Sequence, residues 1–276
     1  MRSSLEIWDM ASGQASVVLQ TDLLIEAPNW APAGDALLVN SDGKLLRVPL
    51  DNPRLEHLDT GFATACNNDH GYSPDGTRIA LTHRTDRGAE IYVIPARGGT
   101  PEPATHNAPS WFHGWSPDGG TLTYAAARGG SRVVGIAVLD LATGEEAFLT
   151  DGAGVCDGPE FTADGTGILY NCDRTGHAQI WRMDRDGGNA ARLYGDRFVN
   201  WFPHPSPDGK HVLCLAYPPF TEGHPRDSHV ALRLTDADGK HPVTLVEFNG
   251  GQGTLNGPCW APDGHAFAYV RYGPVR

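Results

Sequence analysis

The chain has 276 residues, a formal net charge of −12 and 40% hydrophobic residues, so it is long enough to bury a large core. The acidic excess disfavours nucleic acid or an anionic membrane surface as a partner, because both require a basic patch. No apolar run reaches the roughly 18 residues of a transmembrane helix, which disfavours a membrane-spanning protein.

The start of the chain and the cysteines bear on the compartment. Met1–Trp8 contains no apolar signal-peptide core, so we expect a cytoplasmic protein. A periplasmic protein whose leader had been trimmed would look the same. The five cysteines are odd in number and show no C-x-x-C spacing, which favours buried, reduced thiols over a disulfide or zinc framework.

One tetrapeptide recurs along the whole chain. Ser-Pro-Asp-Gly stands at residues 73–76, 116–119 and 206–209, and related sequences start at residues 31, 162 and 261. Successive copies are 42, 43, 46, 44 and 55 residues apart. Proline presets the first corner of a tight turn, and glycine adopts the left-handed conformation at its exit. A period of about 44 residues is typical of a propeller blade with four antiparallel strands.

In chain order, each turn precedes a short strand with little polar alternation, as expected for a strand that is covered on both faces. These predicted second strands are Ala36–Asn40, Arg78–His83, Thr121–Ala127, Gly167–Cys172, His211–Tyr217 and Ala266–Tyr272. A third strand follows in each unit, for example at Glu90–Pro95, Arg132–Leu139 and Gln179–Asp184. It ends in a glycine-rich hairpin, and a weaker fourth strand completes the unit.

The two ends of the chain predict how the last unit is completed. Ile7–Met10 resembles Ile180–Met183, which lies in a predicted third strand. The N-terminus therefore supplies a third strand, with Ala15–Leu19 as the fourth. The C-terminus supplies the matching first and second strands, Asn256–Trp260 and Ala266–Tyr272.

The sequence thus predicts a single all-β domain over residues 1–276, a six-bladed β-propeller with four antiparallel strands in each blade. Its last blade joins residues 4–19 to residues 256–272, so no sheet edge stays open. The short, repetitive turns then lie on a lower face. The long, dissimilar loops lie on an upper face, where a rigid scaffold carries its binding residues. The irregular interval places a long upper loop at Pro218–His229.

The repeat also separates packing residues from residues with another role. The position before the turn is aromatic in five of six units, as inter-blade packing requires, so we assign these side chains to the core. They are Trp30, Tyr72, Trp115, Phe161 and Trp260, with Pro205 in the sixth unit. Three residues before the turn, four units carry proline, whereas two neighbouring units carry His70 and His113.

The upper mouth of the central channel is the predicted binding site. Polar side chains beside tryptophan suit a sugar or another planar polar ligand, which we favour over ordered channel water alone. The ligand-binding candidates are His70, His113, Asp157, Glu160, Arg174, Trp201, His204, His224, Gln252 and Asn256.

Three of these histidines are also a candidate metal set. Imidazole with a carboxylate suits manganese, iron or zinc, so His70, His113 and His204 could hold a divalent ion together with Asp157 or Glu160. The alternative is that these groups bond to channel water and loop backbone, and we favour it because the sequence holds no compact metal motif.

Four arginines and one glycine-rich loop are also placed on the upper face. The arginines are Arg84, Arg128, Arg174 and Arg226. They either clamp a carboxylate or phosphate or form salt bridges with nearby acids, and the sequence favours neither reading. The loop Gly250–Thr254 is predicted to pass close to the channel mouth, with Gln252 and Thr254 as possible contacts.

The turn, the blade length and the phrases Asp157–Phe161, Gln179–Met183 and Asn200–Gly209 resemble the propeller repeats of TolB-like proteins. The resemblance spans nearly the whole chain and implies a six-bladed propeller without the N-terminal domain that TolB carries. TolB is a periplasmic partner of envelope proteins, so the resemblance also admits a protein partner. Oligogalacturonate lyases look related through a propeller with a histidine-rich metal site.

We therefore expect a binding propeller whose upper funnel takes a small polar ligand, a glycan or a segment of a partner protein. One alternative is a carbohydrate-active enzyme, a lyase or hydrolase acting on a sugar or uronate with a histidine or carboxylate as general base. Another is a pure protein-interaction scaffold that uses the rim or the Pro218–His229 loop.

Overall fold

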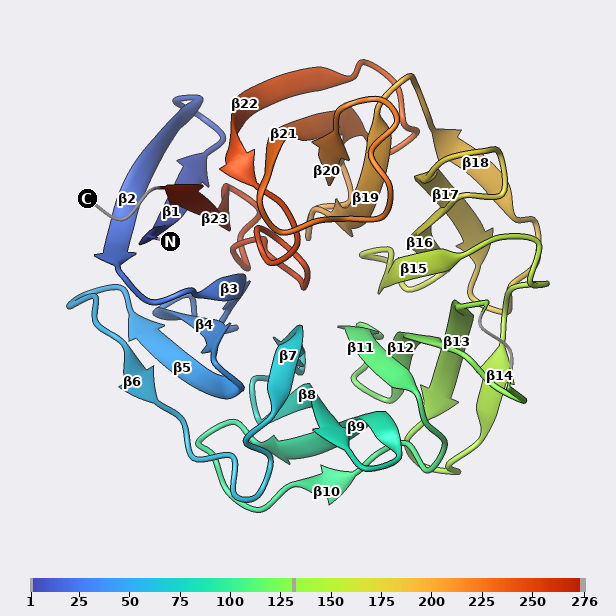
Figure 1. Ribbon diagram of the computed structural model, residues 1–276, viewed down its shortest axis with the longest axis horizontal. Coiled ribbons are helices and arrows are strands. Elements are labelled where there is room, and N and C mark those ends of the chain that lie inside the picture. Colours follow the sequence, from blue (N-terminus) through green and yellow to red (C-terminus); the bar gives the residue numbers. More distant parts are fainter. Residues whose placement is uncertain (1, 131–132, 274–276) are drawn as a thin grey trace.

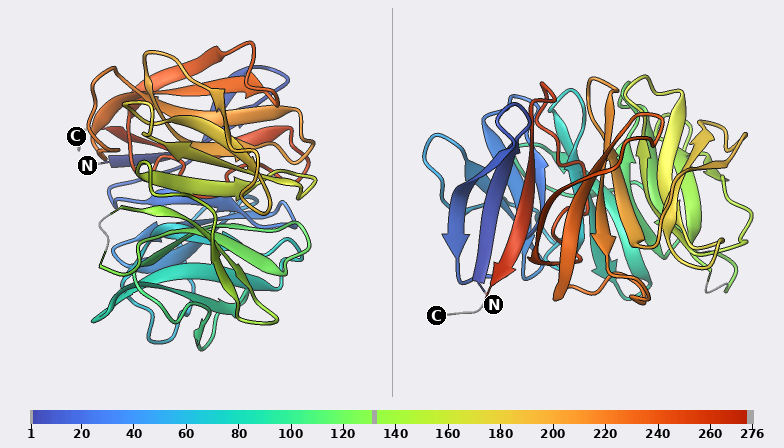
Figure 2. Two further views of the ribbon diagram at one scale, coloured as in Figure 1. Left: turned by 90° about the vertical axis from the view of Figure 1, so that its right-hand side faces the viewer. Right: turned by 90° about the horizontal axis from the view of Figure 1, so that it is seen from above.

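The structure, a computed structural model, describes residues 2–130 and 133–273 and is a ring of six antiparallel sheets around a central axis (Figure 1). Figure 2 shows the same ring from its side, with the strands running between its two faces. Five sheets have four strands and the sixth has three. The predicted six-bladed, all-β propeller is confirmed.

Each four-stranded blade takes its strands in chain order from the axis outward. The blades are β3 (Glu26–Trp30), β4 (Ala36–Ser41), β5 (Lys44–Pro49) and β6 (Glu56–His57); β7 (Cys66–Tyr72), β8 (Arg78–Thr85), β9 (Gly88–Pro95) and β10 (Glu102–Pro103); β11 (Ser110–Trp115), β12 (Thr121–Ala126), β13 (Gly135–Asp140) and β14 (Glu146–Phe148); β15 (Cys156–Phe161), β16 (Gly167–Cys172), β17 (Gln179–Asp184) and β18 (Ala191–Tyr194); and β19 (Val199–Pro205), β20 (His211–Tyr217), β21 (Ser228–Asp236) and β22 (Val243–Gly250).

The predicted second strands are all present, with ends within two residues of those predicted. The predicted third strand Arg132–Leu139 is observed from Gly135, and Arg132 lies outside the described residues. The repeated turn forms as expected: Gly76 N–H donates to Ser73 O at 2.9 Å, and the Ser73 hydroxyl donates to Asp75 Oδ1 at 2.6 Å.

The sixth blade closes the ring with strands from both ends of the chain. β1 (Arg2–Asp9) pairs with β2 (Gln14–Thr21) on one side and with β23 (Ala266–Gly273) on the other. Ile7 lies opposite Ala268, and Glu6 lies opposite Tyr269. The predicted closure is confirmed, and β1 is the middle strand that joins the N-terminal β2 and the C-terminal β23 in one sheet.

The innermost strand of the closing blade differs from the prediction. Asn256–Trp260 was expected to be a strand, but only the single bridge Trp260–Phe267 forms. Residues 254–259 still accept two hydrogen bonds from β23, from Ala268 N–H to Cys259 O and from Val270 N–H to Thr254 O, both at 2.9 Å. Pro258 lies between these acceptors and has no N–H, so a regular ladder cannot continue through it.

The innermost strands carry β-bulges near their upper ends. The register shifts between Glu26 and Asn29 in β3, and the equivalent shifts occur in β7, β11, β15 and β19. In β19 the bulge holds Phe202 at φ 53°, a left-handed conformation that is uncommon for a non-glycine residue. Bulges redirect side chains, so they decide which residues of each inner strand face the channel.

The aromatic residues before the turns pack as predicted and also tie the blades together. Trp115 Nε1–H donates to Gly71 O of the preceding blade at 3.1 Å, and Trp260 Nε1–H donates to His204 O at 3.0 Å. Trp115, Phe161 and Trp260 are buried. Six clusters of apolar side chains fill the spaces within and between the blades.

The prediction that all cysteines are reduced is wrong for one pair. Cys156 and Cys172 lie opposite each other on β15 and β16, and they form a disulfide. Their Cα atoms are 4.1 Å apart, so strand pairing alone brings the two thiols together. Cys66, Cys214 and Cys259 are buried free thiols, as expected.

None of the described residues belongs to a helix that is long and apolar enough to cross a membrane.

Candidate functional site

A cavity of about 290 Å³ opens at the end of the ring where the innermost strands begin. We call it the central cavity. Five inner segments contribute to its wall, together with loops before β13 and β15 and the loops that follow β20 and β22. It is lined by Asn67, Asp69, Trp111, His113, Val134, Val155, Asp157, Trp201, Phe202, His224, Gln252 and Asn256.

His113 and Asp157 form a buried ion pair in the central cavity. His113 Nε2 lies 3.0 Å from Asp157 Oδ1, and the two residues come from neighbouring blades, on β11 and β15. Burial by itself lowers the pKa of His113, but the carboxylate of Asp157, helped by Asp69, outweighs it and raises this pKa to about 9. Burial likewise disfavours the Asp157 anion, yet His113 holds the pKa of Asp157 below its ordinary value. Both groups are therefore charged at neutral pH.

Asp69 is a second carboxyl group of the central cavity, and it is 4% exposed. It accepts a hydrogen bond from Asn256 Nδ2 at 2.6 Å and another from Asn67 Nδ2. Burial raises the pKa of Asp69 to about 6; His113 opposes this shift and the charge of Asp157 adds to it. Asp69 was not among the residues that the sequence predicted for this site. The bulge in β7 brings the residues on either side of Asn68 to the cavity.

Aromatic side chains form much of the remaining wall. Trp201 lies edge-to-face with His224, with ring centroids 4.4 Å apart, and Phe202 contacts the same imidazole at 5.3 Å. Phe202 is held in place by its backbone N–H, which donates to Asn171 Oδ1 of the preceding blade at 3.0 Å. Trp111 lines the cavity from the β11 side and is only partly buried. Its partly exposed ring is available to a ligand.

Two loops carry the remaining cavity residues across the upper face. His224 belongs to the long loop after β20, and its Nε2 lies 3.9 Å from Asp157 Oδ2. Gln252 lies in the glycine-rich loop after β22, as predicted, and its backbone N–H donates to Pro225 O at 3.2 Å. Gly251 has φ 126°, and a Cβ there would lie 2.0 Å from Pro225 O, so only glycine lets the two loops approach this closely.

Three polar atoms of the cavity lining have no hydrogen-bond partner among the described residues. They are Trp201 Nε1, His224 Nδ1 and Asn256 Oδ1, and all three are buried. Buried polar groups in proteins are nearly always paired. The residues that line this one cavity thus include an unpaired donor (Trp201 Nε1), an unpaired acceptor (Asn256 Oδ1) and an unpaired imidazole nitrogen (His224 Nδ1).

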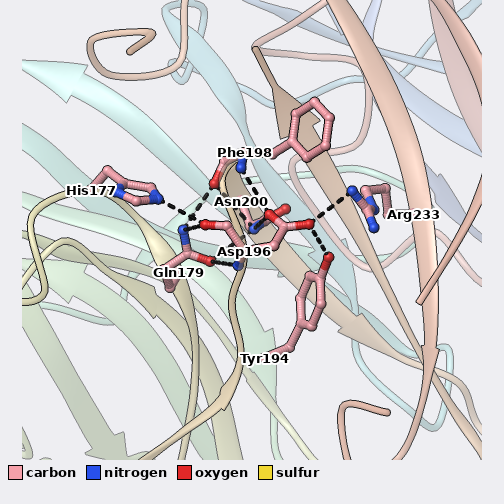
Figure 3. A network of polar contacts seen from close by, with 7 residues as sticks. All are labelled: His177, Gln179, Tyr194, Asp196, Phe198, Asn200 and Arg233. Atoms are coloured by element: carbon pink, nitrogen blue, oxygen red, sulfur yellow. Dashed lines mark hydrogen bonds and ion pairs between the residues drawn. The ribbon is translucent and has the colours of Figure 1, made fainter. Parts of the chain in front are cut away.

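A polar network fixes the start of β19, which carries Trp201 and Phe202 (Figure 3). Asp196 accepts from the Tyr194 hydroxyl at 2.5 Å, from Asn200 Nδ2 at 3.1 Å and from the Phe198 backbone N–H at 2.8 Å. Arg233 of β21 forms an ion pair with the same carboxylate at 2.9 Å. These contacts bind residues 194–200 to both adjoining blades, so the aromatic wall rests on a fixed support.

Gln179 completes this network from β17. Its Oε1 accepts from Asp196 N–H at 3.0 Å and from Asn200 Nδ2 at 2.9 Å, and its Nε2 donates to Phe198 O at 2.8 Å. Every polar atom of this buried amide is therefore used for support.

Several predicted site residues lie outside the central cavity lining. His204 and Glu160 pair with each other, His204 Nδ1 lying 2.6 Å from Glu160 Oε1. Glu160 instead lines a pocket of about 190 Å³ among the aromatic residues that precede the turns. Arg174 forms an ion pair with Asp151 and lies over the Trp181 ring.

His70 is buried on β7, and neither ring nitrogen has a hydrogen-bond partner within the described part of the chain. Burial lowers the pKa of His70 to about 3, so the imidazole is neutral. His204 has both nitrogens engaged, the second lying 3.0 Å from Leu255 O. In residues 2–130 and 133–273 no three His, Cys, Asp or Glu side chains are grouped to hold a metal ion. The metal set of His70, His113 and His204 stays a prediction.

Known proteins with similar sequences and structures show the family of this propeller. A family model of the TolB β-propeller domain matches residues 103–219. An uncharacterised protein of Agrobacterium fabrum (strain C58) is 48% identical over 277 aligned positions, which cover 100% of this chain and 94% of the relative.

Two solved structures are similar to this propeller. A protein of Agrobacterium tumefaciens, provisionally named TolB, superposes with a TM-score of 0.97 at 48% identity, covering 100% of this chain and 99% of that one. TolB from Acinetobacter baumannii has a TM-score of 0.69 at 20% identity, covering 91% of this chain and 64% of that one, and it shows the shared fold alone.

The protein is thus a six-bladed β-propeller with a polar, aromatic-walled cavity at one end of its axis. Its match to the Agrobacterium relative extends over the whole chain. The chain belongs to the TolB-like family of β-propeller proteins.

Proposed function

We propose that this protein binds a small polyhydroxylated ligand of the glycan class in the central cavity. The observation that carries the proposal is the set of three buried, unpaired polar atoms, Trp201 Nε1, His224 Nδ1 and Asn256 Oδ1, around one cavity within the described residues. A ligand with several hydroxyl groups both donates and accepts hydrogen bonds, as a set of one donor, one acceptor and one imidazole nitrogen requires.

The shape and lining of the cavity support the same ligand class. A volume of about 290 Å³ lies at the lower end of the range for small-molecule sites and suits one or two sugar rings. Trp111 offers an aromatic face to the apolar side of a sugar ring. The ion pair of His113 and Asp157 adds fixed donors and acceptors that are already oriented.

Titration with neutral saccharides tests the proposal. Cellobiose, maltotriose and chitotriose are added to the protein while tryptophan fluorescence and melting temperature are recorded, because Trp111 and Trp201 both line the cavity. At least one saccharide should change the fluorescence and raise the melting temperature of the wild type. Trp111→Ala should weaken this binding about tenfold or more, since an aromatic contact is worth roughly 0.5–1.5 kcal/mol beyond its burial.

A matched control uses an aromatic side chain outside the cavity lining. Phe62 is exposed, and Phe62→Ala should bind the saccharide as the wild type does. The proposal fails if no saccharide binds, or if Phe62→Ala and Trp111→Ala weaken binding equally.

A second candidate function is a carbohydrate-active enzyme that uses the same cavity. The observation that favours it is a pair of carboxyl groups with opposite shifts: Asp69, with a pKa of about 6, and Asp157, with a pKa below its ordinary value. Such a difference suits one carboxyl group as a general acid and the other as an anion. Loss of saccharide turnover in Asp69→Asn, with binding retained, would support this candidate; binding without turnover in the wild type would exclude it for that saccharide.

A third candidate function is binding of a partner protein, which one exposed aromatic residue favours. Phe220, in the long loop that carries His224, is 99% exposed. If a partner protein binds and Phe220→Ala removes it while saccharides have no effect, the scaffold reading replaces the glycan proposal.

We also propose that the protein works in an oxidising compartment such as the periplasm. The disulfide of Cys156 and Cys172 supports this over the cytoplasm, where thiols are kept reduced. Fractionation of the producing cell tests the compartment, and recovery of the protein in the cytosol with both thiols free would refute it.

A further inference from the structure

A second depression borders the central cavity. It has a volume of about 330 Å³, and its lining comes from three neighbouring blades, those of β3–β6, β7–β10 and β11–β14; we call it the side groove. Asn67 and Trp111 line both the central cavity and the side groove, so the two spaces meet at these residues. The side groove is lined by Asp42, Gly43, Thr64, Ala65, Cys66, Asn67, Thr82, Arg84, Ala89 and Trp111.

The four arginines that the sequence placed on the upper face behave differently in the structure. Three of them form ion pairs with local acids. These pairs are Arg128 with Glu146 at 2.7 Å, Arg174 with Asp151, and Arg226 with Glu26 at 2.8 Å. Arg84 is exposed, and its guanidinium has no hydrogen bond or ion pair to any other described residue. It is the one member of the four left to bind an external anion.

The position of Arg84 is fixed by its backbone. Its N–H donates to Ala65 O at 3.0 Å, and Arg84 lies opposite Ala89 in the hairpin of β8 and β9. The other wall of the groove comes close because Gly43 has φ 78° and no side chain; a Cβ there would lie 2.4 Å from Thr64 O. The groove is not uniformly basic, since Asp42 also lines it. A ligand would therefore be recognised by the guanidinium itself rather than by a broad positive field.

We infer that the ligand is an acidic saccharide, which places its neutral sugar ring in the central cavity and a carboxylate against Arg84 in the side groove. This inference rests on the proposed function. Asp69 and Asp157 make the central cavity unfavourable for a carboxylate of the ligand, whereas Arg84 can bind one through two parallel hydrogen bonds. Trp111, at the junction of the two spaces, is placed to contact the ring between them.

Matched acids and esters test the inference. Cellobiouronate and glucuronosylxylose, each with one acidic and one neutral ring, are each compared with their methyl esters, which keep the size of the sugar and remove the charge, by titration calorimetry on the full chain. At least one acid should bind the wild type about tenfold more tightly than its ester, as expected for a charged hydrogen-bonded pair. Arg84→Gln should remove this preference while leaving the affinity for the ester unchanged, and sodium chloride should weaken it.

The control variant is Arg174→Gln, because Arg174 was an equal candidate from the sequence but is already paired with Asp151. It should keep the full preference for the acid. Equal binding of acid and ester, or an acid preference that survives in Arg84→Gln, overturns the inference and leaves the proposed function standing. If esters and neutral saccharides also fail to bind, the proposed function falls, and this inference falls with it.

Discussion

His204 Nδ1 lies 2.6 Å from Glu160 Oε1 on the neighbouring blade, and His204 Nε2 lies 3.0 Å from Leu255 O in the closing blade. Both residues are at least nine-tenths buried. Both neighbours of the imidazole are acceptors, so both ring nitrogens are engaged within the protein. His204 was a ligand-binding candidate in the sequence. In the structure its side chain connects its own blade to the blade of Glu160 and to the closing blade.

This relationship predicts that His204 supports the fold and not the ligand. His204→Ala leaves Glu160 buried without its partner, and removing one member of a buried pair typically costs about 3–5 kcal/mol. We expect a loss of that order in the free energy of unfolding, measured with urea. The folded variant should still bind, with wild-type affinity, the saccharide whose binding Trp111→Ala weakens. Wild-type stability in His204→Ala would contradict this assignment.

The ion pair of His113 and Asp157 predicts a pH-dependent stability. The pKa of His113 is about 9 in the folded protein against an ordinary 6.5, so its stabilising contribution is full below pH 6.5 and is lost as the pH rises through 9. Relative to His113→Gln, the wild type should lose about 3 kcal/mol of unfolding free energy between pH 6 and pH 9.5. Urea titrations at several pH values measure this difference. A gap between the two proteins that stays constant with pH would show that the pair carries no such charge.

The buried His70 predicts a loss of stability as the pH falls, which is the opposite of the pH dependence expected for His113. Its pKa is about 3 in the folded protein, so below pH 6.5 the unfolded chain takes up a proton that the folded protein refuses, and stability falls. His70→Leu removes this penalty, and its advantage over the wild type should grow by about 2 kcal/mol between pH 7.5 and pH 5. An advantage that does not grow with acid would mean that His70 is paired in solution.

The fold could be predicted almost completely from the sequence because its signal is repeated. Six copies of one turn fix the number of blades, and the likeness of Ile7–Met10 to Ile180–Met183 fixes the closure of the ring. Side-chain direction could not be predicted in the same way. Alternation along a strand assumes regular pleating, and the bulges in β7 and β19 break that pattern just where the site begins.

The candidate site could be predicted only in part, because the β-bulges change which residues of the inner strands reach the cavity. Six of the residues named from the sequence lie together in the lining of the central cavity: His113, Asp157, Trp201, His224, Gln252 and Asn256. Asp69 was missed because the bulge in β7 changes which residues reach the cavity. Arg174 was included because the sequence does not show that Asp151 neutralises it. The disulfide was missed because Cys156 and Cys172 are 16 residues apart in the chain, and only the register of β15 against β16 brings them together.

The network around Asp196 predicts that one substitution lowers both the stability of the fold and the affinity for the saccharide. Asp196→Asn removes the charge that pairs with Arg233, which is itself buried, so we expect a loss of about 2–4 kcal/mol in unfolding free energy. Saccharide affinity should also fall, because residues 194–200 lead directly into Trp201. Asp151→Asn is the matched control, since Asp151 is exposed and its ion pair with Arg174 should contribute at most about 1 kcal/mol. Equal losses in the two variants would mean that the network has no special role.

The disulfide predicts a thiol count. The denatured, unreduced protein should show three thiols that react with a chromogenic disulfide reagent, and five after reduction. Reduction should lower the unfolding free energy by about 3 kcal/mol, as for a closed loop of this length. Five reactive thiols before reduction would show that the bond does not form.

The pairing of β1 with β23 places Arg2 beside Gly273 in the closing blade. The ring therefore has no structural beginning: a short peptide could connect the present ends, and new ones could be opened in any exposed hairpin. A circularly permuted chain cut in the turn between β17 and β18 should assemble the same six sheets, with a covalent connection where the parent relies on hydrogen bonds alone.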